Sequence, residues 1–315
     1  MNNDGLFLGI DTSNYTTSIA LCDLNGNIVS NIKKILDVKE GERGLRQSDA
    51  VFAHIKNFPE LSLQLKEAIG DTCIKGVGVS VAPRDAEGSY MPCFISGKAI
   101  AYTVAATHNA PIFEFSHQAG HIMAALYSSQ NLYELIDSDF VAFHVSGGTT
   151  EALYVSPHDN TFDIRIIAET ADISAGQAID RAGVMMGLKF PCGKELESLA
   201  KQYNGPLPYA KVSVQDGKCN LSGLENISEK LYKETKDKPL VSAFVLNFIG
   251  KTLIQLTADI RAQYSDIPIL YAGGVMSNSY LKEELSKFDK VYFATPEFST
   301  DNAAGIALLT QKSYK

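Results

Sequence analysis

The sequence predicts an α/β protein made of two similar lobes. Its 315 residues suffice for two domains of ordinary size, or for one large domain folded from two halves. Hydrophobic residues make up 45% and charged residues 20%, which is typical of a soluble α/β protein. The main observation is a repeated module, because residues 5–31 and 139–169 each contain three β-type runs separated by polar turns. The copies start about 135 residues apart, too far for solenoid repeats, which indicates a duplication.

The segment between the two modules has the pattern of the rest of an α/β lobe. Apolar periodicity predicts a helix within 45–70, a buried strand over 74–83 and a small-residue helix over 94–109. A further strand over 110–117 runs directly into a helix. We expect the first lobe to span 1–112 and to be completed by the C-terminal helix 301–315.

The second lobe is expected over 113–300. A helix is predicted at 175–187, followed by a largely helical stretch that a Gly/Pro-rich segment interrupts at 203–212. A buried strand, a Gly-Gly turn and a helix follow at 267–285, and another strand, loop and helix at 290–312. Because no linker is evident, we expect two lobes in close contact with a cleft between them.

Charge and cysteine content exclude several classes of protein. The formal net charge of -8 argues against broad affinity for phosphate backbones, although a local basic patch or a partner can supply one. The five cysteines are scattered and form no C-x-x-C pair, so neither a disulfide framework nor a thiolate zinc site is expected. No apolar run reaches the length that spans a bilayer, and no signal peptide is recognisable. We therefore expect a cytoplasmic protein without a membrane segment.

Two of the six histidines stand four residues apart in the otherwise apolar or small run 115–126. Positions i and i+4 share a helix face, so His117 and His121 can hold one metal ion. Iron and zinc sites commonly add a carboxylate, and Asp301 is the candidate because it lies just before a predicted helix. The alternative is two helix histidines bonded to neighbours, with Asp301 as an N-cap. Gln118 stands where a metalloprotease needs its Glu base, so peptide hydrolysis is not expected.

Two turns, 11–17 (DTSNYTT) and 145–150 (VSGGTT), carry small side chains and hydroxyls beside backbone N–H groups. Such turns suit phosphate oxygens, which need several donors and close approach to the backbone. Taken singly, either turn is better explained as a simple hairpin. Their recurrence in both lobes favours a nucleotide in a cleft that the two turns face.

Three weaker features belong to the same hypothesis. The Gly-Gly turn at 273–274 would let an adenine or a ribose approach the backbone, although it is not a dinucleotide fingerprint. Asp180 could accept hydrogen bonds from ribose hydroxyls, or it could pair with Arg181 or Arg165. The lysine-rich stretch 228–238 is most simply a solvated helix face, and it is also the densest candidate for a nucleic-acid contact.

Taken in order, these motifs resemble those of the TsaD/Gcp family of tRNA adenosine threonylcarbamoyltransferases, formerly described as glycoprotein endopeptidases, along the whole chain. The matches are GIDTSNYTTSIAL for the family's opening strand and turn, HQAGH for H-x-x-G-H, VSGGTT for its S-G-G turn, GQAIDRAG for G-E-A-F-D-K, FPCGK for P-G-G-P, LSGLE for F-S-G-L-K, AGGVMSN for G-G-V-A-A-N and STDNAAGIA for C-T-D-N-A-A-M-I-A. The family belongs to the actin, sugar-kinase and Hsp70 (ASKHA) superfamily. The resemblance therefore implies a duplicated two-lobe ASKHA fold with a nucleotide cleft between the lobes.

The resemblance also implies roles for individual residues. It makes His117, His121 and Asp301 the ligands of one divalent iron or zinc ion, and these residues are catalytic candidates together with Asp11, which stands where the family has Glu. The bound adenylate would be threonylcarbamoyl-AMP, ATP or AMP. Its phosphate and acyl end would be lined by His144, Val145, Ser146, Gly147 and Gly148, and its ribose and adenine would be held by Asp180, Gly193 and Asn278.

The implied activity is metal-dependent transfer of a threonylcarbamoyl group from threonylcarbamoyl-AMP to the adenosine next to the anticodon of tRNA. The metal would act as a Lewis acid on the donor, and AMP would leave. Proteins of this family work with a paralogous TsaB-type subunit and a TsaE-type ATPase. We therefore expect tRNA to bind through a complex with such partners.

Several residues depart from the family pattern and keep two alternatives open. Thr149, Gln177, Cys192, Lys194 and Glu225 replace residues that the family motifs specify. These departures are consistent with a divergent paralogue that retains the donor chemistry and uses another acceptor. The first alternative is carbamoyl transfer from a carbamoyl adenylate to a small molecule. The second is a noncatalytic nucleotide-binding partner subunit, although such subunits typically lose the metal ligands, which are all present here.

Overall fold

The computed structural model describes residues 5–13, 15–37, 45–129, 135–209, 211–298 and 303–314. The chain forms two compact units, of which the first comprises Met1–Ile136, Pro157–Ile164 and Glu297–Lys315, and the second Asp137–Ser156 and Arg165–Pro296. The boundary expected at residue 112 lies instead after residue 136. The reason is that the strand and the helix that follow residue 112 pair and pack with elements of the first unit.

The first unit is built on one five-stranded sheet with the order β3-β2-β1-β4-β5. β2 is antiparallel to both β1 and β3, whereas β4 is parallel to both β1 and β5. Its elements are β1 (Gly5–Ser13), β2 (Thr16–Asp23), β3 (Ile28–Ile35), α1 (Gln47–Ile69), β4 (Cys73–Ala82), α2 (Phe94–His108), β5 (Ile112–Ser116), α3 (His117–Ser128) and α10 (Ala304–Ser313), the last preceded by the short helix η2 (Pro296–Phe298).

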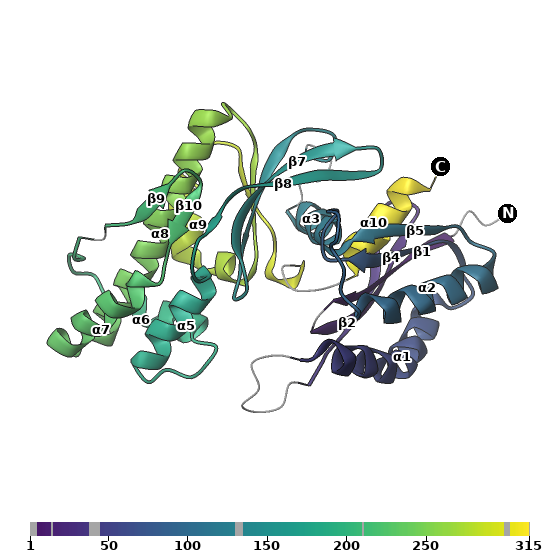
Figure 1. Ribbon diagram of the computed structural model, residues 1–315, viewed down its shortest axis with the longest axis horizontal. Coiled ribbons are helices and arrows are strands. Elements are labelled where there is room, and N and C mark those ends of the chain that lie inside the picture. Colours follow the sequence, from purple (N-terminus) through teal and green to yellow (C-terminus); the bar gives the residue numbers. More distant parts are fainter. Residues whose placement is uncertain are drawn as a thin grey trace. The chain divides into compact units, whose positions relative to one another are not determined.

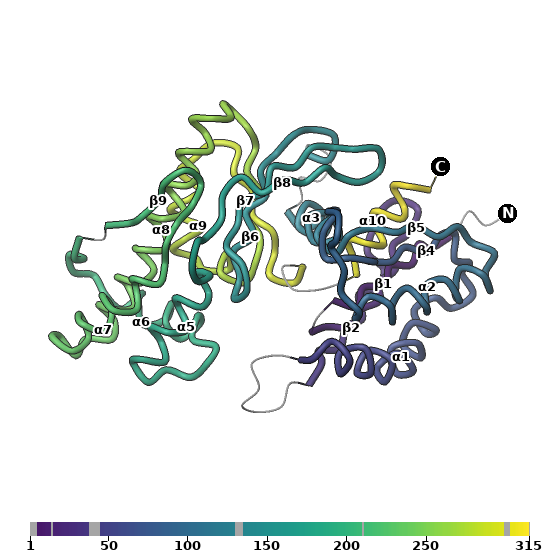
Figure 2. The backbone as a smooth tube through the Cα atoms, viewed as in Figure 1, coloured from purple at the N-terminus to yellow at the C-terminus, as the bar shows by residue number. Residues whose placement is uncertain are grey.

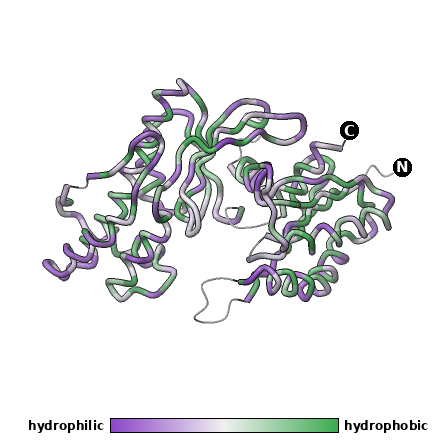
Figure 3. The backbone as a smooth tube through the Cα atoms, in the orientation of Figure 1, coloured by the Kyte–Doolittle hydropathy of each residue, from purple (hydrophilic) through white to green (hydrophobic). Residues whose placement is uncertain are grey.

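Helices cover both faces of this sheet. A Cβ atom added to Gly9 would overlap the backbone of Ala307 on α10, whereas a Cβ atom on Gly97 of α2 would lie 2.7 Å from the hydroxyl of Thr12. Successive strand residues point to opposite faces, so β1 has α10 on one side and α2 on the other. Figures 1 and 2 show α10, in yellow, beside α3 in this unit. The strands between these layers are coloured mainly as hydrophobic in Figure 3, and they carry most of the core.

The second unit is built on a seven-stranded sheet with the order β12-β11-β6-β7-β8-β10-β9. β6 is antiparallel to β7 and parallel to β11, which is also parallel to β12. Its elements are β6 (Phe140–Val145), β7 (Thr150–His158), β8 (Thr161–Thr170), α5 (Ala175–Met185), α6 (Gly193–Ala200), β9 (Ser213–Gln215), β10 (Lys218–Asn220), α7 (Gly223–Thr235), α8 (Lys238–Gln263), β11 (Ile269–Ala272), η1 (Gly274–Ser277), α9 (Ser279–Leu285) and β12 (Val291–Phe293).

The two sheets share one topology. The order β3-β2-β1-β4-β5 in the first corresponds to β8-β7-β6-β11-β12 in the second, and β10 and β9 extend the second sheet beyond β8. In each unit the central strand is antiparallel to the next strand in sequence and parallel to a later one. The prediction of one module used twice is therefore confirmed.

One helix departs from the expectation that no apolar run is long enough to span a bilayer. By length and composition alone, α8 would be long enough and apolar enough to cross a membrane, and it is the one such helix in the described parts of the chain. However, 67% of its most apolar window is buried within the structure, where α8 packs against α6, α7 and α9. Its hydrophobicity is that of a helix at the centre of a packed core.

Candidate functional site

A polar cluster lies at one edge of the first sheet. β1, β4 and β5 run parallel, with Ile10 opposite Val79 and Ser80 opposite Phe115, so their carboxyl ends meet at the same edge. Asp11 lies near the end of β1, Ser80 near the end of β4, and His117 begins α3 directly after β5. Such edges of parallel sheets commonly carry functional groups. The topology therefore brings together residues that are up to 106 positions apart.

Asp11 and His117 are directly bonded in this cluster. Oδ1 of Asp11 lies 2.9 Å from Nδ1 of His117, and the same oxygen accepts a hydrogen bond from the hydroxyl of Ser80. Oδ2 of Asp11 accepts from the backbone N–H of Ser13 at 3.4 Å. The Asp11 side chain is only 1% exposed, whereas that of His117 is 19% exposed. The carboxylate is thus a buried support for a partly accessible imidazole.

His117 and His121 lie side by side on α3. Their ring centroids are 4.3 Å apart with an interplanar angle of 80°. This separation allows one ion, at the usual metal–nitrogen distance of about 2 Å, to contact both rings. The hydroxyl of Ser116 accepts from the N–H of Ala119 at 3.1 Å and donates to Asp85 at 2.5 Å, which fixes the start of the helix that carries both histidines.

The described residues supply only part of a metal site. No group of three or more His, Cys, Asp or Glu side chains is arranged to hold an ion within the parts of the chain that the structure describes. Asp301 lies outside the described residues. Two neighbouring imidazoles, one of them backed by a carboxylate, nevertheless form a donor set that fits zinc or iron(II).

Near this cluster, α1 contributes a buried histidine, His54, that is affected by the charge of Asp11. His54 is fully buried, and its Nδ1 lies 2.8 Å from the hydroxyl of Thr17, which also accepts from the amide of Asn57 at 3.1 Å. Burial lowers the pKa of His54 to about 4, and the negative charge of Asp11 only partly offsets this effect. His54 is therefore neutral at pH 7.

This burial predicts a loss of stability in acid. The unfolded chain binds a proton at His54 near pH 6.5, whereas the folded chain binds it only near pH 4, so stability falls as the pH drops from about 6.5 towards 4. Between pH 7 and pH 4.5, about 2 kcal/mol of the free energy of unfolding should be lost. Urea unfolding followed by circular dichroism measures this loss, which should shrink in His54→Gln. An equal loss in the variant would assign the pH dependence to other groups.

In the second unit, the residues predicted to meet the phosphate lie at the end of β6 and in the turn between β6 and β7. The hydroxyl of Ser146 accepts from the N–H groups of Gly148 and Thr149 at 3.2 and 3.1 Å. Nδ1 of His144 lies 3.2 Å from the hydroxyl of Thr149. A Cβ atom on Gly147 would meet no atom within 4 Å, so a ligand can approach the backbone at this glycine. Val145, by contrast, is fully buried.

The start of α5 packs directly on this turn. The N–H of Gly176 donates to the carbonyl of Ser146 at 3.1 Å, and a Cβ atom on Gly176 would lie 2.6 Å from Cα of Gly147. Ser174 donates to the carbonyl of Gly147 at 2.7 Å and forms a capping box with Gln177. Either Glu or Gln can complete such a box. Gln177 can therefore fill the same structural role as the Glu of the family motif.

Asp180 has a different partner from those considered in the sequence. Its Oδ1 accepts the backbone N–H of Cys192 at 2.7 Å, which holds the segment before Gly193 against α5. Arg181 instead pairs with Glu225 at 3.1 Å, and the guanidinium of Arg165 lies 4.4 Å from the centre of the Tyr154 ring. Neither proposed ion pair of Asp180 is formed.

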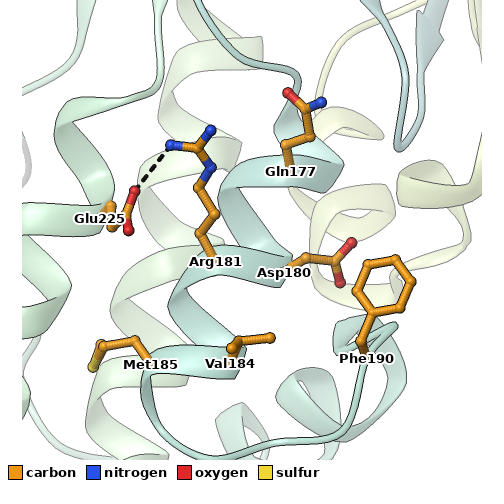
Figure 4. A pocket seen from close by; sticks show the side chains of 7 residues that line it. All are labelled: Gln177, Asp180, Arg181, Val184, Met185, Phe190 and Glu225. Carbon is orange, nitrogen blue, oxygen red and sulfur yellow. Dashed lines mark hydrogen bonds and ion pairs between the residues drawn. The ribbon is translucent and has the colours of Figure 1, made fainter. Parts of the chain in front are cut away.

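A pocket of about 460 Å³ lies on the exposed side of α5. Figure 4 shows Asp180 beside the ring of Phe190 on one side and the Arg181–Glu225 ion pair on the other. The pocket is lined by Gln177, Asp180, Arg181, Val184, Met185, Phe190 and Glu225. Two residues that depart from the family motifs, Gln177 and Glu225, therefore share one pocket.

The Gly-Gly turn is pressed against the end of β6. Gly273 has a φ of 102°, and a Cβ atom there would overlap the carbonyl oxygen of Val145, so only glycine fits. Asn278 caps α9, because its Oδ1 accepts from the N–H of Leu281 at 3.1 Å. Its side chain is thus engaged in the helix start. Gly193, at the start of α6, faces open space.

Several supporting residues were missed by the sequence reasoning, namely Ser80, Asp85, Ser116 and Ser174. A signal existed for Ser80, because it is a single hydroxyl in a buried, apolar strand. Ser116 and Ser174 each precede a predicted helix, which is the usual position of an N-cap. Asp85 carried no such signal, since only the fold brings it to Ser116.

Comparison with known proteins agrees with the sequence motifs. The family model described as tRNA N6-adenosine threonylcarbamoyltransferase, TsaD, matches residues 27–308. The tRNA N6-adenosine threonylcarbamoyltransferase of Thermosipho africanus is 28% identical over 328 residues, covering 98% of this chain and 94% of that protein. The protein of the same name from Bacillus subtilis is 28% identical over 325 residues, covering 96% and 89%.

Solved structures agree on the fold. HypF from T. kodakarensis has a TM-score of 0.62 at 13% identity, covering 98% of this chain and 47% of that chain. A ROK family glucokinase from Streptomyces griseus has a TM-score of 0.50 at 13% identity, covering 97% and 98%. The expected ASKHA-type fold is thereby confirmed. With motifs, family model and full-length relatives in agreement, the chain belongs to the TsaD family of tRNA N6-adenosine threonylcarbamoyltransferases.

Proposed function

We propose that this protein transfers a threonylcarbamoyl group from threonylcarbamoyl-AMP to the adenosine next to the anticodon of tRNA. The observation that carries the proposal is the family match over residues 27–308, which extends over both units. The polar cluster of the first unit supports it, because Asp11, His117 and His121 lie together there. The reaction is an acyl transfer in which the exocyclic amine of adenosine attacks the carbamoyl carbon and AMP leaves.

The proposal assigns a divalent iron or zinc ion to His117, His121 and Asp301. When bound, the ion would supply Lewis-acid polarisation of the donor carbonyl. The imidazoles hold their positions because Ser116 fixes the start of α3 and Asp11 bonds His117. The partial exposure of His117 leaves it accessible to a ligand.

The adenylate is assigned to the second unit. We propose that the turn from His144 to Gly148 meets its phosphate and acyl end, since the backbone at Gly147 is open to approach. The start of α5 packs on that turn, and a helix N-terminus favours negative charge. Asp180, Gly193 and Asn278 are proposed to hold the ribose and adenine. The hydrogen bonds that Asp180 and Asn278 already make would then orient their remaining oxygen and amide groups.

The tRNA is proposed to bind through a complex. The chain has a formal net charge of -8, which is unfavourable for holding a polyanion by itself. A TsaB-type subunit and a TsaE-type ATPase are the proposed partners, and they would supply part of the tRNA-binding surface.

In the direct test, the purified protein receives an unmodified tRNA transcript and threonylcarbamoyl-AMP that carries a label in its threonine moiety. The protein is tested alone and together with TsaB-type and TsaE-type subunits of the same organism. The matched control is the same transcript with guanosine in place of the target adenosine, because guanosine lacks the exocyclic N6 amine. Label should enter only the adenosine-containing transcript. Label in a small molecule instead of either transcript would refute the proposed acceptor and favour a small-molecule carbamoyltransferase.

A further inference from the structure

We propose that Asp11, held in place by Ser80, is a positioning residue that fixes the protonated nitrogen of His117. The starting observation is the distance of 2.9 Å between Oδ1 of Asp11 and Nδ1 of His117. An ionised carboxylate only accepts hydrogen bonds, so the proton in this contact belongs to Nδ1. His117 is then in the tautomer that has its proton on Nδ1 and a free lone pair on Nε2. Because a ligand atom needs a lone pair, Nε2 is the atom that can bind a metal ion.

Ser80 makes this arrangement rigid. Its hydroxyl donates to the same oxygen of Asp11 that His117 contacts, and Ser80 is fully buried on β4. The N–H of Ser13 donates to the other oxygen. Three donors from β1, β4 and α3 thus converge on one carboxylate that is almost completely shielded from water. Charge-assisted hydrogen bonds in such surroundings are strong and strongly directional.

The arrangement is that of an outer-shell partner for a ligand histidine. Histidines that bind metals usually donate their second N–H to a carboxylate or carbonyl, which orients the ring and raises its basicity. The chain has Asp at position 11 where the family motif has Glu, so the carboxylate sits one methylene closer to β1. In this structure, the shorter Asp side chain has its Oδ1 within hydrogen-bonding distance of both Ser80 and His117. The inference rests on the metal site of the proposed function.

The experiment compares the wild-type protein with Asp11→Asn, Ser80→Ala and the control Asp23→Asn. Asp23 is also a carboxylate of the first unit that accepts several hydrogen bonds, but its partners are Asn25 and Asn27 in the β2–β3 turn. Zinc affinity is measured by competition with a chromophoric chelator. Asp11→Asn should bind zinc about 10–100-fold more weakly, Ser80→Ala should show a smaller loss, and Asp23→Asn should match the wild type.

A second readout needs neither metal nor activity. Long-range ¹H–¹⁵N spectra of the metal-free protein with ¹⁵N-labelled histidine report which ring nitrogen of His117 is protonated, with His117→Gln assigning the signals. The wild type should show the Nδ1–H tautomer, and Asp11→Asn should show a mixture or the other tautomer. Unchanged affinity and an unchanged tautomer in Asp11→Asn would overturn the inference. A wild type that binds no zinc or iron but has the Nδ1–H tautomer would refute the metal site and leave the pairing intact.

Discussion

The double variant His117→Ala/His121→Ala is expected to lose metal binding and, with it, threonylcarbamoyl transfer. Loss of a single outer-shell partner commonly weakens a metal site roughly 10–100-fold, so removal of two ligands should exceed the upper end of that range. The side chains lie at the surface edge of the first unit, and His117 is already partly exposed. Folding should therefore persist, which circular dichroism verifies.

Metal content after equilibrium dialysis against iron or zinc measures the first effect. Entry of label from threonylcarbamoyl-AMP into tRNA measures the second, and binding of a nonhydrolysable threonylcarbamoyl-adenylate analogue, with and without metal, shows whether donor binding is lost with the metal. The matched control is His108→Ala/His158→Ala, since His108 is the last residue of α2 and His158, on the β7–β8 hairpin, lies beside Asp159 and Asp163. Equal metal binding by the two double variants would contradict the metal assignment and favour a noncatalytic nucleotide-binding role.

Gly305→Ala is expected to destabilise the first unit by about 3 kcal/mol or more. A Cβ atom on Gly305 would overlap the carbonyl oxygen of Gly120 and lie 2.9 Å from the backbone nitrogen of Ala124. Both obstacles belong to the backbone of α3, so a whole helix would have to move, and overpacking of this kind typically destabilises by about 1–3 kcal/mol or more. Because α3 carries His117 and His121, zinc affinity should fall as well.

Two comparisons make this prediction specific. In Gly120→Ala the new methyl would meet the flexible end of Ile306 at 2.8 Å, so the effect should be smaller than in Gly305→Ala. Gly223→Ala places a methyl near the start of α7, where nothing lies within 4 Å, and should change the free energy of unfolding by no more than about 0.5 kcal/mol. Urea unfolding of all three variants tests this order. Equal stability of Gly305→Ala and Gly223→Ala would contradict the close packing of α3 on α10.

Much of the fold was predictable because its signals are local. The three-strand modules were visible as apolar runs separated by turns, and the structure has β1 to β3 and β6 to β8 at those positions. The boundary between units was not predictable, because it depends on β5 pairing with β4, some thirty residues earlier. Which sheet a five-residue strand joins is decided by long-range contacts that leave no periodic trace in the sequence.

The candidate site was likewise predictable from the sequence only in part. The spacing of His117 and His121 indicated their common helix face, and the structure has their rings adjacent. The bond between His117 and Asp11 could not be anticipated, since it depends on the register of β1, β4 and β5. The partner of Asp180 is a backbone N–H, a group that every residue except proline carries, so no side-chain pattern could reveal it.

The position of α10 has a consequence for how the protein is made. The ribosome releases β1 to β5 early, but α10, which packs on β1 at Gly9, is translated last of the described elements. Until that helix emerges, a nascent chain presents an uncovered apolar surface, which is the kind of surface that chaperones bind. The long segment Arg165–Pro296 is meanwhile complete. The portion translated first is thus the last to mature, and ribosome stalling shortly before α10 would leave it as a substrate for quality control.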